Sequence, residues 1–448
     1  MHRTACVGSW LVLWMIIGMG VQAQPSPDTL RLDEAVSRAL KENIQAQIAR
    51  NDAAIARNNR SLGNAGFLPN IDVTGGYNET RSRIEQQRAG GSTLDTSGVA
   101  STRWNGGAEL RWRVFDGLGR FATYDRLGAK QDQQEAATRE QVEIVVADVI
   151  DAYYDVARQQ QQRSVFREAV SISQERLRIA EMRRDIGTAS DLDVRQARVD
   201  LNADSAAVLR QDIVLETAQA TLFRLLGDPE PPSDVAVSDP IVIDPTLSFE
   251  SLLSIARDRS PALQQAEQAL QAAEAAEREV WADYFPALDA TLGYGYSRFE
   301  GGTGFLLTSE TFDLTYGLSL TFNLFDGLNR NRRRQNAQIR TRNADLRVDD
   351  IETRLRSELQ SAFASYRNRL RIVALERENL NVAEANVDLA LERFRLGTIT
   401  SVELRDVQEQ RIQAESRLLT ARFDAKRAEV ELLRLSGQLL SGVEEATP

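Results

Sequence analysis

The side chains most often used in catalysis and metal binding are scarce in this 448-residue chain. Its single cysteine and single histidine, Cys6 and His2, both lie close to the N-terminus. Residues 1–23 combine a basic start, an apolar run over 7–20 and an A-x-A-like site at 21–23, which is the pattern of a signal peptide. Its removal would exclude Cys–His and Ser–His–Asp catalysis and zinc sites of the usual ligands. No cofactor is therefore expected.

The remaining candidates for chemistry are carboxylates. Glu403 and Asp406 lie three residues apart, which places them on one face of a helix. Asp193 precedes Glu403 by 210 residues in a similar local sequence. Such groups could cap a helix or, if they gather, attract cations. No polar constellation converges around them in the sequence, so an enzyme is not predicted.

An internal repeat relates these positions. The segment 110–120, Leu-Arg-Trp-Arg-Val-Phe-Asp-Gly-Leu-Gly-Arg, is similar to the segment 320–330, Leu-Thr-Phe-Asn-Leu-Phe-Asp-Gly-Leu-Asn-Arg, 210 residues later. Gly187-Thr188 recurs as Gly397-Thr398 at the same offset. Two copies are too few for a solenoid, so the sequence predicts one duplicated unit.

Both halves predict the same order of elements. The first repeat, 24–226, would contain a helix, a β-hairpin at about 70–115, a long helix at about 118–186, a tip at 187–190 and a return helix. The second repeat, 249–438, would contain a helix, a hairpin at about 287–324, a long helix at about 328–396, a tip at 397–400 and a return helix. Residues 227–248 hold five of the eleven prolines and predict a linker, and 439–448 would form a C-terminal tail.

The predicted long helices carry a packing seam. Residues 328–396 contain neither Gly nor Pro, and at 1.5 Å per residue they would form a rod of roughly 100 Å. Apolar residues at 359, 363, 366, 370 and 373 follow the alternating steps of four and three that are typical of coiled coils. Considered alone, these helices would suit an ordinary antiparallel coiled coil.

Four other segments alternate apolar and polar residues. The clearest is 312–324, and 288–297 and 104–114 show the same alternation, whereas 71–77 shows it more weakly. Strict alternation over about 10 residues, with aromatics among the apolar set, is typical of outer-membrane strands. A sheet packed on a soluble core is the alternative for one such strand, but it explains four strands in two matched hairpins poorly.

Four strands are too few to close a barrel. In lipid, two open edges would leave unpaired backbone groups that cost several kcal/mol each. Copies of the chain would therefore have to pool their strands. Two copies give eight strands and three give twelve with room for a lumen, and these arguments alone leave both numbers open.

The turns have a physical explanation of their own. Asp116-Gly117 and Asp326-Gly327 end a strand and precede a helix, where an Asp side chain caps free N–H groups. Gly187 and Gly397 lie where a long helix must stop, which suits a left-handed residue. The segments 190–193 and 400–403 match a capping box.

The duplicated plan, the Phe-Asp-Gly-Leu turns at 115–118 and 325–328 and the paired Gly-Thr turns resemble the TolC family of outer-membrane efflux proteins. The resemblance covers nearly all of the mature chain. It implies an α+β membrane protein in which a homotrimer shares a 12-stranded transmembrane β-barrel, continued by a long α-helical coiled-coil barrel in the periplasm. It also implies the outer-membrane exit duct of a tripartite efflux or type I secretion system, driven by an inner-membrane transporter. A periplasmic adaptor protein would dock at the tips, Gly187, Thr188, Gly397 and Thr398.

The same resemblance implies a periplasmic gate. Glu403 and Asp406 match the two acidic positions that form constricting rings in the family, and Asp193 is the first-repeat counterpart of Glu403. In a trimer, each position would supply three carboxylates around one axis and favour cations. Ile399 and Phe394 depart from the family, in which an arginine and a tyrosine can stand there. Closure would therefore rely more on apolar packing.

Other functions are less well supported by the sequence. A periplasmic coiled-coil scaffold or adaptor without a channel is the alternative. Nucleic acid is not an expected partner, because the formal net charge is −11. The arginine-rich run 330–334 would lie just inside the membrane, where arginines reach lipid phosphates or solvent. The exported substrate, whether drug, polypeptide or metal ion, and the transporter stay open.

Overall fold

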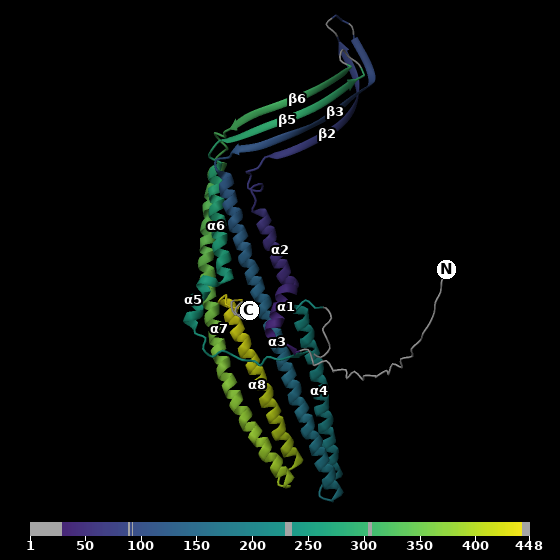
Figure 1. The fold of residues 1–448 in the computed structure, drawn as a ribbon, viewed down its shortest axis with the longest axis vertical. Coiled ribbons are helices and arrows are strands. Elements are labelled where there is room, and N and C mark those ends of the chain that lie inside the picture. Colours follow the sequence, from purple (N-terminus) through teal and green to yellow (C-terminus); the bar gives the residue numbers. More distant parts are fainter. Residues whose placement is uncertain (1–28, 88–89, 92, 229–234, 303–306, 441–448) are drawn as a thin grey trace, which may run out of the picture.

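The structure is a computed structural model that describes residues 29–87, 90–91, 93–228, 235–302 and 307–440. The predicted signal peptide, 1–23, lies outside these residues. Figure 1 shows a long bundle of helices that carries a single large β-sheet at one end. The sheet and the end of the bundle far from it are thus the two candidate functional regions.

The elements follow one another in two similar series. The first series is β1 (Thr29–Leu30), α1 (Leu32–Glu42), α2 (Ile44–Asn59), β2 (Asn70–Gln87), β3 (Thr93–Phe115), α3 (Gly119–Asp185) and α4 (Asp191–Leu225). The second is β4 (Ala236–Val237), α5 (Phe249–Arg259), α6 (Pro261–Ala282), β5 (Ala287–Gly301), β6 (Thr308–Thr321), α7 (Asn329–Arg395) and α8 (Ser401–Leu435). The α3–α4 and α7–α8 turns both lie at the end of the bundle that is far from the sheet (Figure 1).

The seam predicted in the second long helix is its packed face. Helices α3 and α7 each have 67 residues, which corresponds to about 100 Å. Leu359, Tyr366 and Val373 of α7 are buried, and Phe363 and Leu370 pack partly buried beside Tyr366. The alternating steps of four and three therefore identify the side of α7 that contacts α8 and α5.

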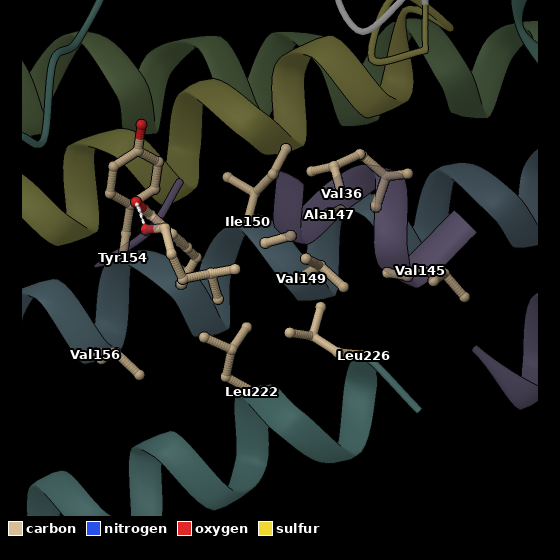
Figure 2. Packing of buried hydrophobic residues seen from close by; sticks show 14 of the residues in the cluster. Val36, Val145, Ala147, Val149, Ile150, Tyr154, Val156, Leu222 and Leu226 are labelled. Atoms are coloured by element: carbon tan, nitrogen blue, oxygen red, sulfur yellow. Dashed lines mark hydrogen bonds between the residues drawn. The ribbon is translucent and has the colours of Figure 1, made fainter. Parts of the chain in front are cut away.

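The largest core lies around the middle of α3. Val146, Val149 and Tyr153 are fully buried there and pack against Val36 of α1 and Leu222 of α4. Figure 2 shows side chains from α1, α3 and α4 meeting in this cluster. Truncating such a side chain to Ala typically costs about 2–5 kcal/mol, so this core fixes the long rods at their centre.

The short helix expected before each hairpin is broken in two. Asn43 separates α1 from α2, and Ser260 separates α5 from α6. The Asn43 side chain accepts hydrogen bonds from the N–H groups of Gln45 and Ala46, at 2.9 and 3.1 Å. After Ser260 the second helix instead begins with Pro261, whose fixed φ suits a first helical position. The two repeats thus make the same break by different capping chemistry.

The predicted linker contains structure that the sequence did not indicate. Within it, β4 pairs in parallel with β1, so the two series are joined by a two-stranded sheet. Asp239 then accepts hydrogen bonds from the Leu32 N–H and the Tyr153 hydroxyl, each at 2.7 Å. Val235 is buried in the main core. The described part of the segment therefore holds α1 against α3.

The four long strands form one antiparallel sheet in the order β2-β3-β5-β6. Residues that lie directly opposite one another share a face, so rows can be followed across the sheet. Ile71, Leu110, Leu292 and Tyr316 form one apolar row. The next row, on the opposite face, is Asn70, Arg111, Thr291 and Gly317. One face is therefore apolar and the other polar, as the alternation predicted.

The last strand is shorter than the alternation suggested. β6 ends at Thr321, whereas the pattern continued to Leu324. The carbonyl of Leu324 accepts a hydrogen bond from Nη2 of Arg330, at 3.1 Å. This backbone is thus turned toward the start of α7 and lies outside the ladder with β5. The expectation that Phe322 and Leu324 belong to the strand was wrong, because alternation does not report where pairing stops.

Candidate functional site

The two strand-to-helix junctions are built alike. The Asp116 carboxylate accepts a hydrogen bond from the Arg120 N–H at 3.0 Å, and Asp326 accepts one from the Arg330 N–H at 2.8 Å. Gly117 and Gly327 have φ values of 69° and 68°. Each Asp thus stabilises the free N–H groups and the positive end of the following helix.

These junctions also hold a strained residue that sequence reasoning missed. Leu118 and Leu328 have φ values of 68° and 67°, and they are the only non-glycine residues with positive φ in the described part of the chain. The left-handed region costs an L-residue about 1–2 kcal/mol. The Gly-Leu pair in both repeats was the available signal, since each turn requires two successive left-handed residues.

The two tips end in the same hydrogen-bonded motif. Gly187 is left-handed at φ 77°, and the Thr188 N–H donates to the Arg183 carbonyl at 2.8 Å. Gly397 at φ 76° and Thr398, which donates to the Arg393 carbonyl at 3.0 Å, repeat this geometry. This is the Schellman arrangement that closes a helix on a glycine. It gives both tips a defined shape.

The predicted gate carboxylates have different surroundings. Glu403 closes a capping box with Thr400, whose N–H donates to the Glu403 carboxylate at 2.7 Å, and this bond lowers the pKa of Glu403. Asp193 forms the same box with Ser190, whose N–H donates to it at 2.8 Å, and its pKa is lowered too. Asp406 is exposed and accepts a hydrogen bond from Gln410 at 3.0 Å. One chain therefore places Glu403 and Asp406 on the exposed first turns of α8.

A buried arginine next to the tips was not predicted. Arg176 of α3 is 2% exposed, and its Nη2 bonds Asp200 of α4 at 3.0 Å. The same nitrogen bonds the hydroxyl and the carbonyl of Ser401 of α8, at 2.9 and 3.2 Å. Removing one partner from a buried ion pair is strongly destabilising. Arg176 thus joins three helices at the base of the predicted gate.

Three further contacts fasten α8 and the second tip to the first repeat. Arg405 forms two bonds with Asp204, at 2.6 and 2.8 Å. Arg411 forms two bonds with Glu168, at 2.8 and 2.9 Å. Arg183 donates to the carbonyl of Phe394 and lies over its ring, 4.7 Å from the centroid.

One feature of the sequence could have predicted that Arg176 is buried. Arg176 occupies a position in the packing seam of α3, in which Ala169, Ser173 and Ala180 are also buried.

Phe394 and Ile399, the departures from the family pattern, belong to an apolar cluster. Phe394 is buried and packs with Leu404, while Ile399 and Val407 lie partly buried around them. Ile179 of α3 also packs against this cluster, which therefore joins the second tip to the first repeat. Apolar packing therefore does shape this tip, together with the Arg183 contacts.

The described part of the chain contains long helices and many carboxylates. None of its helices combines the length and apolar character needed to cross a bilayer. Its His, Cys, Asp and Glu residues form no group of three or more that could hold a metal ion.

Comparison with known proteins gives consistent matches. The family model for outer membrane efflux proteins matches residues 35–228 and 252–438. The outer membrane efflux protein BepC of Brucella suis biovar 1 (strain 1330) is 22% identical over 417 residues, which cover 91% of this chain and 85% of BepC. Protein CyaE of Bordetella pertussis (strain Tohama I) is 28% identical over 346 residues, which cover 76% of this chain and 70% of CyaE.

A solved structure shows the same fold. The outer-membrane channel OprN superposes with a TM-score of 0.68 at 21% sequence identity, covering 91% of this chain and 90% of OprN. Taken together, the matches support the channel and not the periplasmic scaffold or adaptor that the helices alone would allow. Because the family model spans both halves, the chain belongs to the outer membrane efflux protein family, and it is an efflux channel protein of the cell outer membrane with a long helical body in the periplasm.

Proposed function

We propose that three copies of the chain close a 12-stranded barrel through the outer membrane. The observation that carries this proposal is the pair of free sheet edges. Among the described residues, β2 pairs only with β3 and β6 only with β5. Joining β6 of one copy to β2 of the next would satisfy both edges. Eight strands would nearly fill with side chains, whereas twelve leave a lumen.

In this proposal the chain is exported after removal of residues 1–23 and is organised as two repeats, 24–226 and 249–438. The helical bodies of three copies would continue the lumen into the periplasm. The assembly would be a passive exit duct for drugs or other exported substrates. A periplasmic adaptor and an inner-membrane transporter would supply the cargo and the driving force.

The mass of the purified assembly in a mild detergent tests the proposal most directly. The expected result is a trimer that conducts ions in planar bilayers. A monomer that keeps its strand content in the same detergent would contradict the barrel. A dimer would contradict the number of copies.

The carboxylates at the second tip are proposed to line the resting aperture. The double variant Glu403→Gln/Asp406→Asn removes both charges, while Gln at position 403 can still accept the Thr400 N–H bond of the capping box. We expect reduced cation selectivity and weaker block by trivalent cations, because rings of carboxylates attract cations. Single-channel recording in planar bilayers measures both.

Glu392→Gln is the matched control, because Glu392 is an exposed carboxylate near the same tip. It should leave selectivity and block unchanged. If the double variant also behaves like the wild type, Glu403 and Asp406 serve only to cap and solvate α8. Asp193, in the equivalent capping box, would extend the ring, and Asp193→Asn is expected to have a smaller effect of the same sign.

The tips are proposed to dock onto the adaptor. Replacing Gly397 by Val puts a β-branched residue at φ 76°, where an L-residue is strained by about 1–2 kcal/mol. We expect the Schellman turn at Thr398 to distort and active efflux from cells to be lost, while insertion into the outer membrane persists. Gly397→Asn is the control, because Asn tolerates the left-handed region. Normal efflux by Gly397→Val would refute this docking site.

A further inference from the structure

Four arginines lie in the first six residues of α7, directly after the sheet. They are Arg330, Arg332, Arg333 and Arg334. Two carboxylates lie among them: Asp283 forms an ion pair with Arg333, and Asp326 forms ion pairs with both Arg330 and Arg333. The cluster thus keeps more positive than negative charge. The first repeat allows us to separate the arginines that build the junction from those that do not.

Arg330 has a structural counterpart. Arg120, 210 residues earlier, lies within 3.4 Å of its Asp116 and over the ring of Phe67 at 5.4 Å. Arg330 lies within 3.7 Å of its Asp326 and over the ring of Tyr284 at 5.5 Å. This shared geometry shows that one arginine per junction is sufficient for the turn.

The other three arginines have no basic counterpart in the first repeat. Arg332, Arg333 and Arg334 correspond to Ala122, Thr123 and Tyr124 at the offset of 210 residues. The first junction folds into the same shape without them, so the turn does not require their charge. In the described part of the chain, the guanidinium of Arg332 bonds only Asn329, at 3.4 Å. Arg332 and Arg333 are both exposed.

The surroundings of these arginines resemble a membrane interface. Leu324 and Phe325, just before α7, are 82% and 76% exposed. Arg334 lies 4.2 Å from the ring centroid of Trp281, a half-exposed aromatic at the end of α6. Exposed apolar residues followed by tryptophan and arginine are characteristic of the level at which a bilayer changes from hydrocarbon to headgroups.

At the opposite end of the sheet, the apolar face ends in a row of charged and aromatic residues. Beyond Tyr296 and Phe312, the next row on this face contains Arg298 and Glu310, which form an ion pair at 3.2 Å, and the aromatic residues Trp104 and Tyr77. The apolar band is thus bounded by this row on one side and by the α7 arginines on the other. The arginine side adjoins the helical body and therefore faces the periplasmic leaflet.

From these observations, we propose that Arg332 and Arg333 bind the phosphate of anionic phospholipids in the periplasmic leaflet of the outer membrane. The proposal rests on the outer-membrane location and not on the gate or the adaptor. Trp281 and Leu324 would contact the adjoining glycerol and acyl region. The positive charge of the cluster favours an anionic headgroup, since a zwitterionic headgroup also carries a positive group that the arginines repel.

The test uses the full purified assembly in neutral detergent, titrated with phosphatidylglycerol or phosphatidylcholine. Bound lipid is counted by native mass spectrometry. We expect saturable binding of phosphatidylglycerol, weakened about 30-fold in Arg332→Gln/Arg333→Gln, since each arginine near anionic lipid contributes about fivefold and the two contributions multiply. Arg342→Gln, an exposed arginine about 15 Å further along α7, should bind like the wild type.

Three outcomes would overturn the proposal. The first is equal phosphatidylglycerol binding by the wild type and the double variant. The second is equal binding of the two lipids by the wild type. The third is saturation by millimolar inorganic phosphate without lipid. Conductance of the double variant in planar bilayers is measured alongside, so loss of lipid binding is distinguished from loss of the channel. If the assembly dissociates while lipid binding is unchanged, which is a case of the first outcome, these arginines lie between copies.

Discussion

Replacing Arg176 by Leu is expected to raise the resting conductance of the channel and to lower its stability. Arg176 holds Asp200 and the first residue of α8, Ser401, from a position that is 2% exposed. Leaving Asp200 without its partner should cost about 3–5 kcal/mol. Single-channel recording gives the conductance, and thermal unfolding followed by circular dichroism gives the stability.

Arg178→Gln is the matched control for this prediction. Arg178 lies two residues further along α3, is exposed, and bonds only Glu175 within the described residues. It should change neither conductance nor unfolding. If Arg176→Leu lowers the unfolding temperature but leaves the resting conductance unchanged, the buried arginine stabilises the bundle without holding the aperture.

The contacts around Arg176 explain why α8 is the element to perturb. Arg405 and Arg411 fasten α8 to Asp204 and Glu168 of the first repeat. The proposed gate carboxylates lie on the first turns of the same helix. A movement of α8 away from α3 and α4 would therefore break these ion pairs and displace the carboxylates together. The same movement would also separate the apolar cluster of Phe394 and Leu404 from Ile179 of α3, which packs against it.

Local patterns in the sequence predicted much of this architecture. Alternation of apolar residues predicted the sheet because each strand exposes two chemically different faces. The Gly-Thr and Phe-Asp-Gly-Leu turns predicted the reversals because only a few residues tolerate those backbone angles. The capping boxes at Ser190 and Thr400 were expected from four residues each and are present. All of these signals depend on neighbours within a few positions.

Apart from the left-handed Leu118 and Leu328, which are local, the features that were missed depend on residues far apart in the chain. Asp204 and Arg405 are 201 residues apart, and Arg176 and Ser401 are 225 apart. The pairing of β1 with β4 joins segments that each contribute only two residues. No periodicity marks such contacts, because they arise only when the repeats pack together. The predicted C-terminal end of β6 was wrong for a related reason, since the end of this strand depends on where its pairing with β5 stops.

The two faces of the sheet allow a sharp test of membrane insertion. Leu318 lies on the apolar face opposite Ala290, one row from the central row of Leu292 and Tyr316. Its neighbour Ser319 lies on the polar face opposite Asp289. An arginine at these two adjacent positions would therefore meet lipid in one case and a carboxylate beside the lumen in the other.

Leu318→Arg is expected to destabilise each copy by about 2–4 kcal/mol, because a guanidinium near the middle of the bilayer has no partner in lipid. Ser319→Arg, the matched control, should be tolerated, since it places the same side chain on the polar face beside the ion pair of Asp289 and Arg113, where water can solvate it. Heat-resistant trimer on a semi-native gel and folded protein recovered in outer-membrane fractions measure the difference. Loss of trimer in Ser319→Arg with normal assembly of Leu318→Arg would show that the apolar face lines the interior and that the proposed orientation of the sheet is reversed.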